Sequence, residues 1–239
     1  MIQTLQKLAG IHTHLTQTHT NDVNFNANLP INVEVIKQLD AMRYRLKVGR
    51  KELSTKSHKA LREGENYWGD FSQGKGGILT LSHLYKQPLL FQKHPYFLEI
   101  PLHEVLNPKT FSMQAFKTLL IHTLSSEALS KEAFNALSYM LLALNKEVIH
   151  LPLRDSGKRT LLQFKAQENG YRFYAAFENL GPIEGTITPS GIVLSALYEK
   201  SLYFLDKVFS KFDKIESITL RRDIAPLFDA TELSLDLKG

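Results

Sequence analysis

The sequence has no cysteine and a single tryptophan among its 239 residues. The lack of cysteine excludes disulfide bonds, thiolate metal ligands and a cysteine nucleophile. No stretch approaches the roughly 20 consecutive apolar residues that a membrane-spanning helix needs. The first ten residues also lack the continuous apolar run of a signal peptide. We therefore expect a cytoplasmic protein without a membrane span.

What is present is the composition of an ordinary globular protein, with 43% hydrophobic and 22% charged residues. The length suits one large domain or two small ones. The predicted fold class is α+β, in four segments. These are a short helix and flexible leader (1–29), a small β-barrel (30–86), a helical connector (87–146) and an α+β module (147–239).

Alternating apolar and polar residues indicate strands between residues 31 and 85. The clearest case is 43–48, where Tyr44, Leu46 and Val48 alternate with basic residues. Turn-forming residues at 49–50, 61–64 and 74–77 separate the strands. Short strands at near-regular spacing predict a closed barrel, which leaves no exposed strand edge.

Besides the short N-terminal helix, three helices are predicted from apolar residues spaced three and four apart. The first follows Asn107-Pro108, the second is capped by Ser130, and the third spans 200–212 with Ser201 as its N-cap. Strands over 171–177, 183–189, 192–198 and 215–220 surround the third helix. Its apolar stripe is Leu202, Leu205, Val208, Phe209 and Phe212. The C-terminal module is therefore predicted to be a sheet with one packed amphipathic helix.

The stretch Asn179-Leu-Gly-Pro-Ile-Glu184 joins two of these strands. On its residues alone it suits a turn or bulge in any α+β domain. With the order strand, strand, helix, strand after it and the lead-in strands of 148–167, it resembles the C-terminal domain of flagellar hook-length control proteins over residues of about 147–220. The predicted partner-binding residues are Glu178, Asn179, Leu180, Gly181 and Pro182.

That resemblance implies a non-enzymatic protein associated with the flagellum and type III export, which docks on the export gate or another assembly partner through its C-terminal module. Family members that gauge hook length carry a long disordered N-terminal arm. The leader of roughly 28 residues would reach at most about 100 Å when fully extended. We therefore expect a docking role and not a gauge role.

The alternative function is nucleic-acid binding by the predicted barrel. Residues 37–62 hold nine basic and two acidic side chains, a net charge of +7, whereas the whole chain carries +5. Polyanion binding is predicted for Arg43, Arg45, Lys47, Arg50 and Lys51. Nearby Tyr67, Trp68 and Phe71 would offer stacking surfaces for bases. An acidic protein partner, or solvent alone, would suit the same face.

Catalytic and cofactor motifs are missing. Residues 69–75 have the Gly-x4-Gly-Lys spacing of a phosphate-binding loop, but Gly76 replaces the magnesium-binding Ser or Thr and a strand is predicted to follow. No Gly-x-Ser-x-Gly elbow is present. Glu178 and Glu184 flank the turn and could form an acid–base pair, but carboxylates at the edges of strands and turns are usually solvated. We predict no catalytic residue, no cofactor and no small-molecule substrate.

A metal site is not predicted either. The nine histidines lack ligand spacing. His12, His14 and His19 lie in a polar leader without acidic company, so we interpret that leader as a flexible linker.

Overall fold

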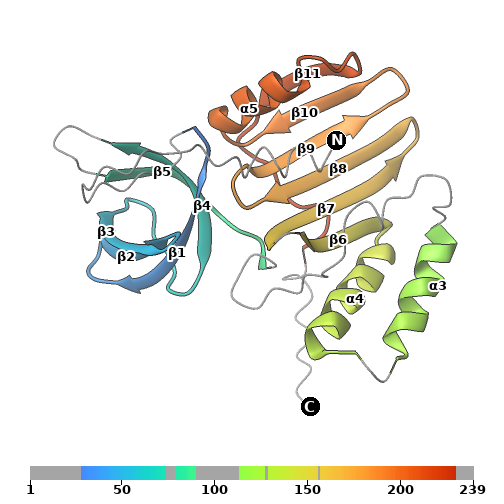
Figure 1. The fold of residues 1–239 in the computed structure, drawn as a ribbon, viewed down its shortest axis with the longest axis horizontal. Helices are drawn as coiled ribbons and strands as arrows, with labels where there is room; N and C mark the ends of the chain where they lie inside the picture. The colour runs from blue at the N-terminus through green and yellow to red at the C-terminus, as the bar shows by residue number, and fades with distance from the viewer. Residues whose placement is uncertain (1–27, 74–78, 90–112, 127–128, 156, 230–239) are drawn as a thin grey trace.

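The structure is a computed structural model that describes residues 28–73, 79–89, 113–126, 129–155 and 157–229. This part of the chain forms a mixed α+β fold with two β-sheets and three helices, and strands predominate (Figure 1). The predicted N-terminal helix, the three leader histidines and the 74–77 turn lie outside the described residues. No helix in the described part is long and apolar enough to cross a membrane.

The N-terminal sheet is antiparallel, in the order β3-β2-β1-β4-β5. Its strands are β1 (Ile31–Gln38), β2 (Arg43–Val48), β3 (Lys51–Lys56), β4 (Asn66–Gln73) and β5 (Leu79–Lys86). The predicted alternation in β2 is observed, with Tyr44, Leu46 and Val48 buried and the basic residues exposed. The sheet curls around this core until β3 and β5 approach each other.

The predicted closed barrel is not found in the described residues. No hydrogen-bonded ladder joins β3 to β5, so the sheet stays open between them. Strand spacing in the sequence predicts how many strands form, but closure depends on whether the first and last strands come into register.

The C-terminal sheet has six strands in the order β11-β10-β9-β8-β7-β6. They are β6 (Val148–Asp155), β7 (Lys158–Gln167), β8 (Gly170–Phe177), β9 (Gly181–Ile187), β10 (Ile192–Ala196) and β11 (Ile215–Leu220). Neighbouring strands are antiparallel except β10 and β11, which are parallel. Helix α5 (Glu199–Phe209) provides the crossover that a parallel pair requires.

One face of this sheet is covered by helices. Helix α4 (Lys131–Leu144) packs on β6, α3 (Met113–Leu124) packs on α4, and α5 packs on β10 and β11. Ser130 caps α4 as predicted, since its side chain accepts a hydrogen bond from the Ala133 backbone N–H. The three-and-four spacing predicts an apolar stripe of Phe134, Leu137, Leu141 and Leu144 on α4. That prediction is partly wrong: Leu137 is buried but Phe134 is exposed, and Ala136 and Ala143 are fully buried instead.

Helix α5 begins two residues before the predicted N-cap. Ser201 lies inside its first turn, is fully buried, and donates from Oγ to the carbonyl of Leu180 at 2.7 Å. Leu205 and Phe209 are buried as predicted, but Phe212 lies beyond the helix and is exposed. The polar group of Ser201 therefore links α5 to the turn before β9.

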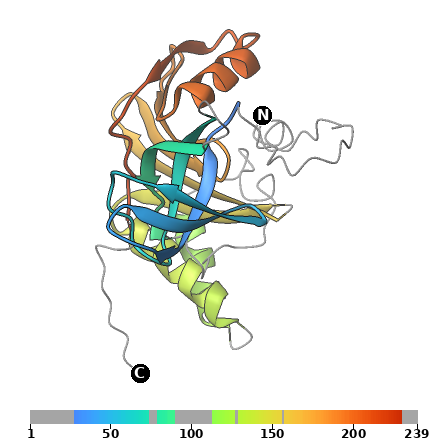
Figure 2. The ribbon, with the colours of Figure 1, turned by 90° about the vertical axis from the view of Figure 1, so that its left-hand side faces the viewer.

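The second face of the C-terminal sheet packs partly against the N-terminal sheet, which lies beside it (Figures 1 and 2). We call this contact the joint. It is a cluster of buried residues from both sheets, from the start of α5 and from the segment after β11, namely Trp68, Leu161, Tyr174, Ala176, Tyr198 and Ile224. The two sheets therefore share apolar core.

Candidate functional site

A row of polar side chains crosses the second face of the C-terminal sheet. Each strand contributes one residue, and neighbours in the row are directly opposite each other in register. The polar row is His150, Gln163, Tyr174, Glu184, Ser195 and Thr219. The first four are buried. Because buried polar groups need hydrogen-bond partners, something must cover and satisfy this row.

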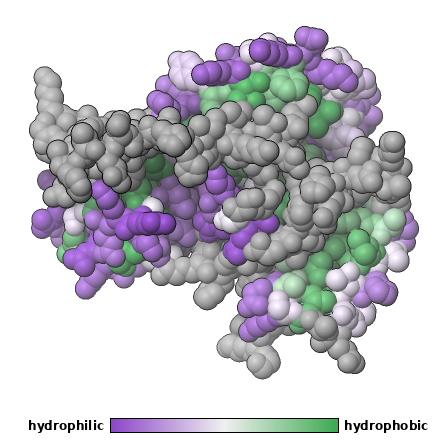
Figure 3. All heavy atoms as spheres, viewed as in Figure 1, coloured by the Kyte–Doolittle hydropathy of each residue, from purple (hydrophilic) through white to green (hydrophobic). Residues whose placement is uncertain are grey.

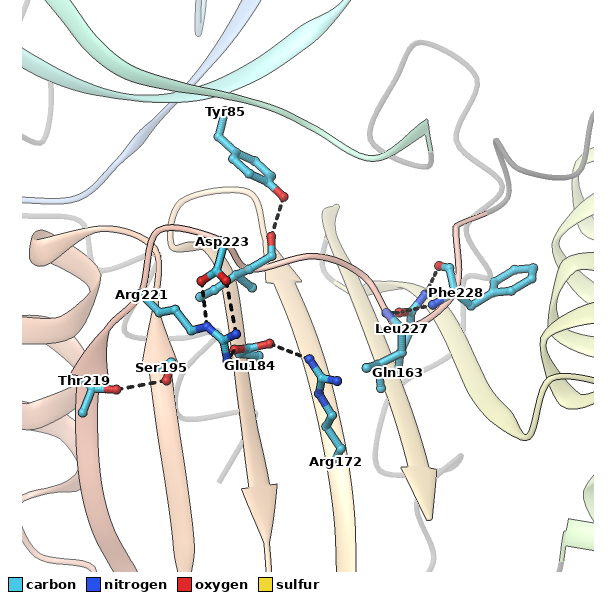
Figure 4. A network of polar contacts seen from close by, with 11 residues as sticks. Tyr85, Gln163, Arg172, Glu184, Ser195, Thr219, Arg221, Asp223, Leu227 and Phe228 are labelled. Atoms are coloured by element: carbon cyan, nitrogen blue, oxygen red, sulfur yellow. Dashed lines mark hydrogen bonds and ion pairs between the residues drawn. The ribbon is translucent and has the colours of Figure 1, made fainter. Parts of the chain in front are cut away.

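The cover is residues 221–229, which we call the strap. It leaves β11 and runs back across the sheet to β6 and β7 (Figure 4). The Gln163 side chain holds its far end: Oε1 accepts from the backbone N–H groups of Leu227 at 2.7 Å and Phe228 at 3.2 Å, and Nε2 donates to the Phe228 carbonyl at 2.6 Å. One amide side chain thus satisfies backbone N–H and carbonyl groups that a neighbouring strand would otherwise hydrogen-bond.

The near end of the strap is held by charge. The buried carboxylate of Glu184 accepts from Arg221 Nη1 at 2.5 Å and from Arg172 Nη2 at 3.2 Å (Figure 4). Arg221 also pairs with Asp223 at 2.7 Å, and the hydrogen bond between them raises the pKa of Arg221 and lowers that of Asp223. Two guanidinium groups compensate the cost of burying the Glu184 charge.

Two members of the polar row have incomplete hydrogen bonding. Among the described residues, His150 Nε2 and the Tyr174 hydroxyl have no partner. Burial lowers the pKa of His150 to about 3 and raises the pKa of Tyr174 well above its ordinary value. Both side chains are therefore neutral near pH 7. The His150 ring packs edge-to-face on Phe228 of the strap, with ring centroids 5.2 Å apart.

The predicted partner-binding turn lies at the joint. Leu180, Gly181 and Pro182 are buried, and Glu178 and Asn179 are half-buried. Gly181 has φ +68°, which favours glycine at this position. In this structure, the three buried residues of the turn offer no surface to a partner, and their role is to join elements of the fold.

Hydrogen bonds fix the joint at three points. Trp68 Nε1 donates to the Glu178 carbonyl at 3.1 Å, and Tyr198 Oη donates to the His83 carbonyl at 3.0 Å. The Tyr85 hydroxyl donates to the carbonyl of Ile224 in the strap. Burial raises the pKa of Tyr85 and of Tyr198, so both hydroxyls keep the protons they donate.

The predicted basic face is on the surface. The structure brings Arg43, Arg45 and Lys47 together on the exposed side of β2, with Arg50 and Lys51 at the adjoining turn. Acidic residues offset part of the charge. Arg43 pairs with Asp40, and Lys47 Nζ lies 4.0 Å from Glu34. Hydrogen bonds from the Met42 backbone and from Arg43 lower the pKa of Asp40 to about 2.

The predicted stacking surface beside this face is wrong for two residues. Trp68 is fully buried in the joint, and Tyr67 is buried in the core of the N-terminal sheet. Neither ring can stack on a base without unfolding part of the protein. The side chain of Phe71, the third predicted stacking residue, lies outside the described part of the structure.

The sequence motifs considered for chemistry form no catalytic geometry in the described residues. Each glutamate beside the turn is in an ion pair, Glu178 with Arg159 and Glu184 with two arginines. The glycine-rich stretch after Gly69 leads into strand β5, whereas a phosphate-binding loop needs a helix there. The described residues contain no group of three or more His, Asp and Glu side chains that could hold a metal ion.

Comparison with known protein families, with curated proteins and with solved structures found no match.

Proposed function

We propose that the protein is a non-enzymatic docking protein whose C-terminal module binds a protein partner. The partner implied by the hook-length-control resemblance is the flagellar type III export gate. The observation that carries the proposal is the element order: β8, a turn, β9 with Gly181 at positive φ as its first residue, β10, α5 and β11. This is the order of strands and helix on which the resemblance rests.

The docking surface that the geometry favours is the α5–β11 end of the module. Among the described strands, β11 is the last of its sheet, and its residues are mostly exposed. Tyr203, Phe212 and Leu220 are 69%, 41% and 39% exposed there. Apolar side chains lie among charged ones over this end (Figure 3). An edge strand next to exposed apolar groups can accept a strand from a partner.

The turn of residues 178–182 supports this surface from inside. The Ser201–Leu180 hydrogen bond anchors the first turn of α5, and Gly181 lies against the Tyr198 ring at the start of the helix. In this proposal the predicted docking residues position α5, and the residues of α5 and β11 contact the partner.

The test is direct binding to the purified cytoplasmic domain of the export gate, measured by biolayer interferometry. Tyr203→Ser combined with Leu220→Lys should weaken binding about tenfold or more, because exposed aromatic and apolar anchors dominate such contacts. The matched control is Leu119→Ser, which removes a 60%-exposed apolar side chain from α3. It should leave binding unchanged.

Motility gives the second readout. A strain that carries the Tyr203/Leu220 double variant should swim poorly, and the Leu119 control should swim normally. Full motility without the chain, together with no binding of the wild-type protein to the export gate, would contradict the export assignment.

A second candidate function is polyanion binding, favoured by the exposure of all five predicted basic residues. Affinity for a single-stranded oligonucleotide should then fall steeply with salt, because bound cations return to the phosphates. Changing Arg43, Arg45 and Lys47 to Ser should lower the slope of log affinity against log salt by roughly 2.

Changing Lys207, Lys211 and Lys214 to Ser removes the same charge near α5 and should leave that slope unaltered. If neither triple variant changes the salt dependence, or if no binding occurs at low salt, the basic face does not bind nucleic acid.

A further inference from the structure

We propose that a hollow between β7, β8 and the strap binds a small organic anion through Lys165 and Arg172. The two residues are directly opposite each other on the antiparallel strands β7 and β8. Along the strands, they lie two residues from Gln163 and Tyr174, which are paired in the polar row. Since side chains two residues apart on a strand share a face, Lys165 and Arg172 are on the face that the strap covers.

Two like charges opposite each other destabilise a sheet unless an anion lies between them. In the described part of the chain this compensation is incomplete. Lys165 Nζ lies 3.9 Å from Glu147, a carboxylate that is 85% exposed. Arg172 makes one contact, at 3.2 Å, with Glu184, which binds Arg221 more closely at 2.5 Å. Both cations are half-exposed, so an arriving anion can reach them.

The hollow next to these cations has a volume of about 450 Å³. That size falls within the roughly 300–1,000 Å³ typical of small-molecule sites. It is lined by Lys165, Ala166, Gln167, Arg172, Ala225, Pro226 and Leu227. The strands thus contribute the two cationic side chains to the hollow, and the strap contributes its apolar wall.

This arrangement specifies the chemical class of the ligand. The planar guanidinium of Arg172 suits the oxygens of a phosphate or carboxylate, and the Lys165 ammonium adds a second positive charge. The apolar wall of Pro226 and Leu227 suits a ring or short hydrocarbon body attached to that group. The ligand is a small phosphate or carboxylate with an apolar body. The proposal does not depend on the docking function.

Gln163 gives the site its shape, because its three hydrogen bonds hold Leu227 and Phe228 above the sheet. Gln163 does not line the hollow, so it is a positioning residue. Its loss should move the apolar wall and leave the two cations in place. A Gln163 variant therefore separates the contribution that the shape of the hollow makes to binding from the contribution of its charge.

The experiment is a titration of the whole protein followed by amide NMR shifts of Ala166, Gln167 and Leu227. The probes are phenyl phosphate, benzoate and inorganic phosphate. We expect saturable shifts with the two aromatic anions, at a Kd of about 1 mM or below, and weaker binding of inorganic phosphate, which has no apolar body. The tighter of the two aromatic probes identifies the preferred anionic group.

Variants make the site assignment testable. Lys165→Gln and Arg172→Gln should each weaken phenyl phosphate binding about tenfold. Lys211→Gln with Lys214→Gln, on the exposed surface after α5, should not change it. Gln163→Leu should abolish the advantage of phenyl phosphate over inorganic phosphate. Shifts that do not saturate, or that persist equally in the Lys165/Arg172 double variant, would overturn the proposal.

Discussion

Replacing Gly181 by valine should destabilise the protein by about 2–5 kcal/mol. Gly181 has φ +68°, and a β-branched residue there costs on the order of 1–3 kcal/mol. A Cβ would also lie 2.9 Å from Tyr198 Cε2 and 3.0 Å from Cδ2. The tyrosine ring is buried and its hydroxyl is hydrogen-bonded, so it cannot move away without cost, and overpacking of this kind adds about 1–3 kcal/mol.

Gly49→Val is the matched control for this substitution. Gly49 has φ +60°, but nothing lies within 4 Å of the position a Cβ would take. The control therefore has the backbone cost without the clash. Urea unfolding of both variants gives the difference, and an equal loss of stability at the two positions would show that the joint tolerates a side chain beside Tyr198.

Replacing Trp68 by alanine should cost about 3–5 kcal/mol, the usual loss for a large buried aromatic side chain. Trp68 is fully buried, its ring stacks on Tyr85 with centroids 6.4 Å apart, and its Nε1–H satisfies the Glu178 carbonyl. Because it belongs to the N-terminal sheet and packs on the C-terminal one, its loss should also weaken the coupling between the sheets.

The conservative variant Trp68→Phe should keep much of the packing and lose the hydrogen bond, at a cost of about 1–3 kcal/mol. Amide hydrogen exchange measures the coupling, since Trp68→Ala should reduce protection in β4 and β9 together. A loss below about 1 kcal/mol with unchanged protection in both sheets would mean that the joint is not a shared core.

Strand positions were predictable because the signal for a strand is local. Tyr44, Leu46 and Val48 alternate with basic residues, and the pattern alone decides which side is buried. The helix stripe of α4 was harder to predict. Small residues such as Ala136 and Ala143 let that helix approach its neighbours closely, whereas large Phe134 points to solvent. A prediction weighted toward large apolar residues therefore included Phe134 and omitted the two alanines, although it placed Leu137 correctly in the core.

The role of Trp68 could not be predicted from the sequence. An aromatic residue in a sheet that also carries basic side chains is as compatible with a place in the core as with a base-stacking surface. The polar row and the anion site were missed for a different reason. His150, Gln163, Tyr174 and Glu184 become neighbours only when the register of four strands is known. The segment 221–229 carried no periodic signal that would have predicted a strap.

The position of the strap along the chain bears on how the protein is made. Every strand that carries the polar row is synthesised before residues 221–229, and so is the apolar surface that Ile224 completes at the joint. Until the strap emerges, Gln163 lacks its backbone partners in Leu227 and Phe228, and Glu184 lacks Arg221, so water must take their places. A chain whose strap has not yet been synthesised therefore carries a hydrated, half-covered sheet, and this face is completed when a segment without regular structure displaces that water.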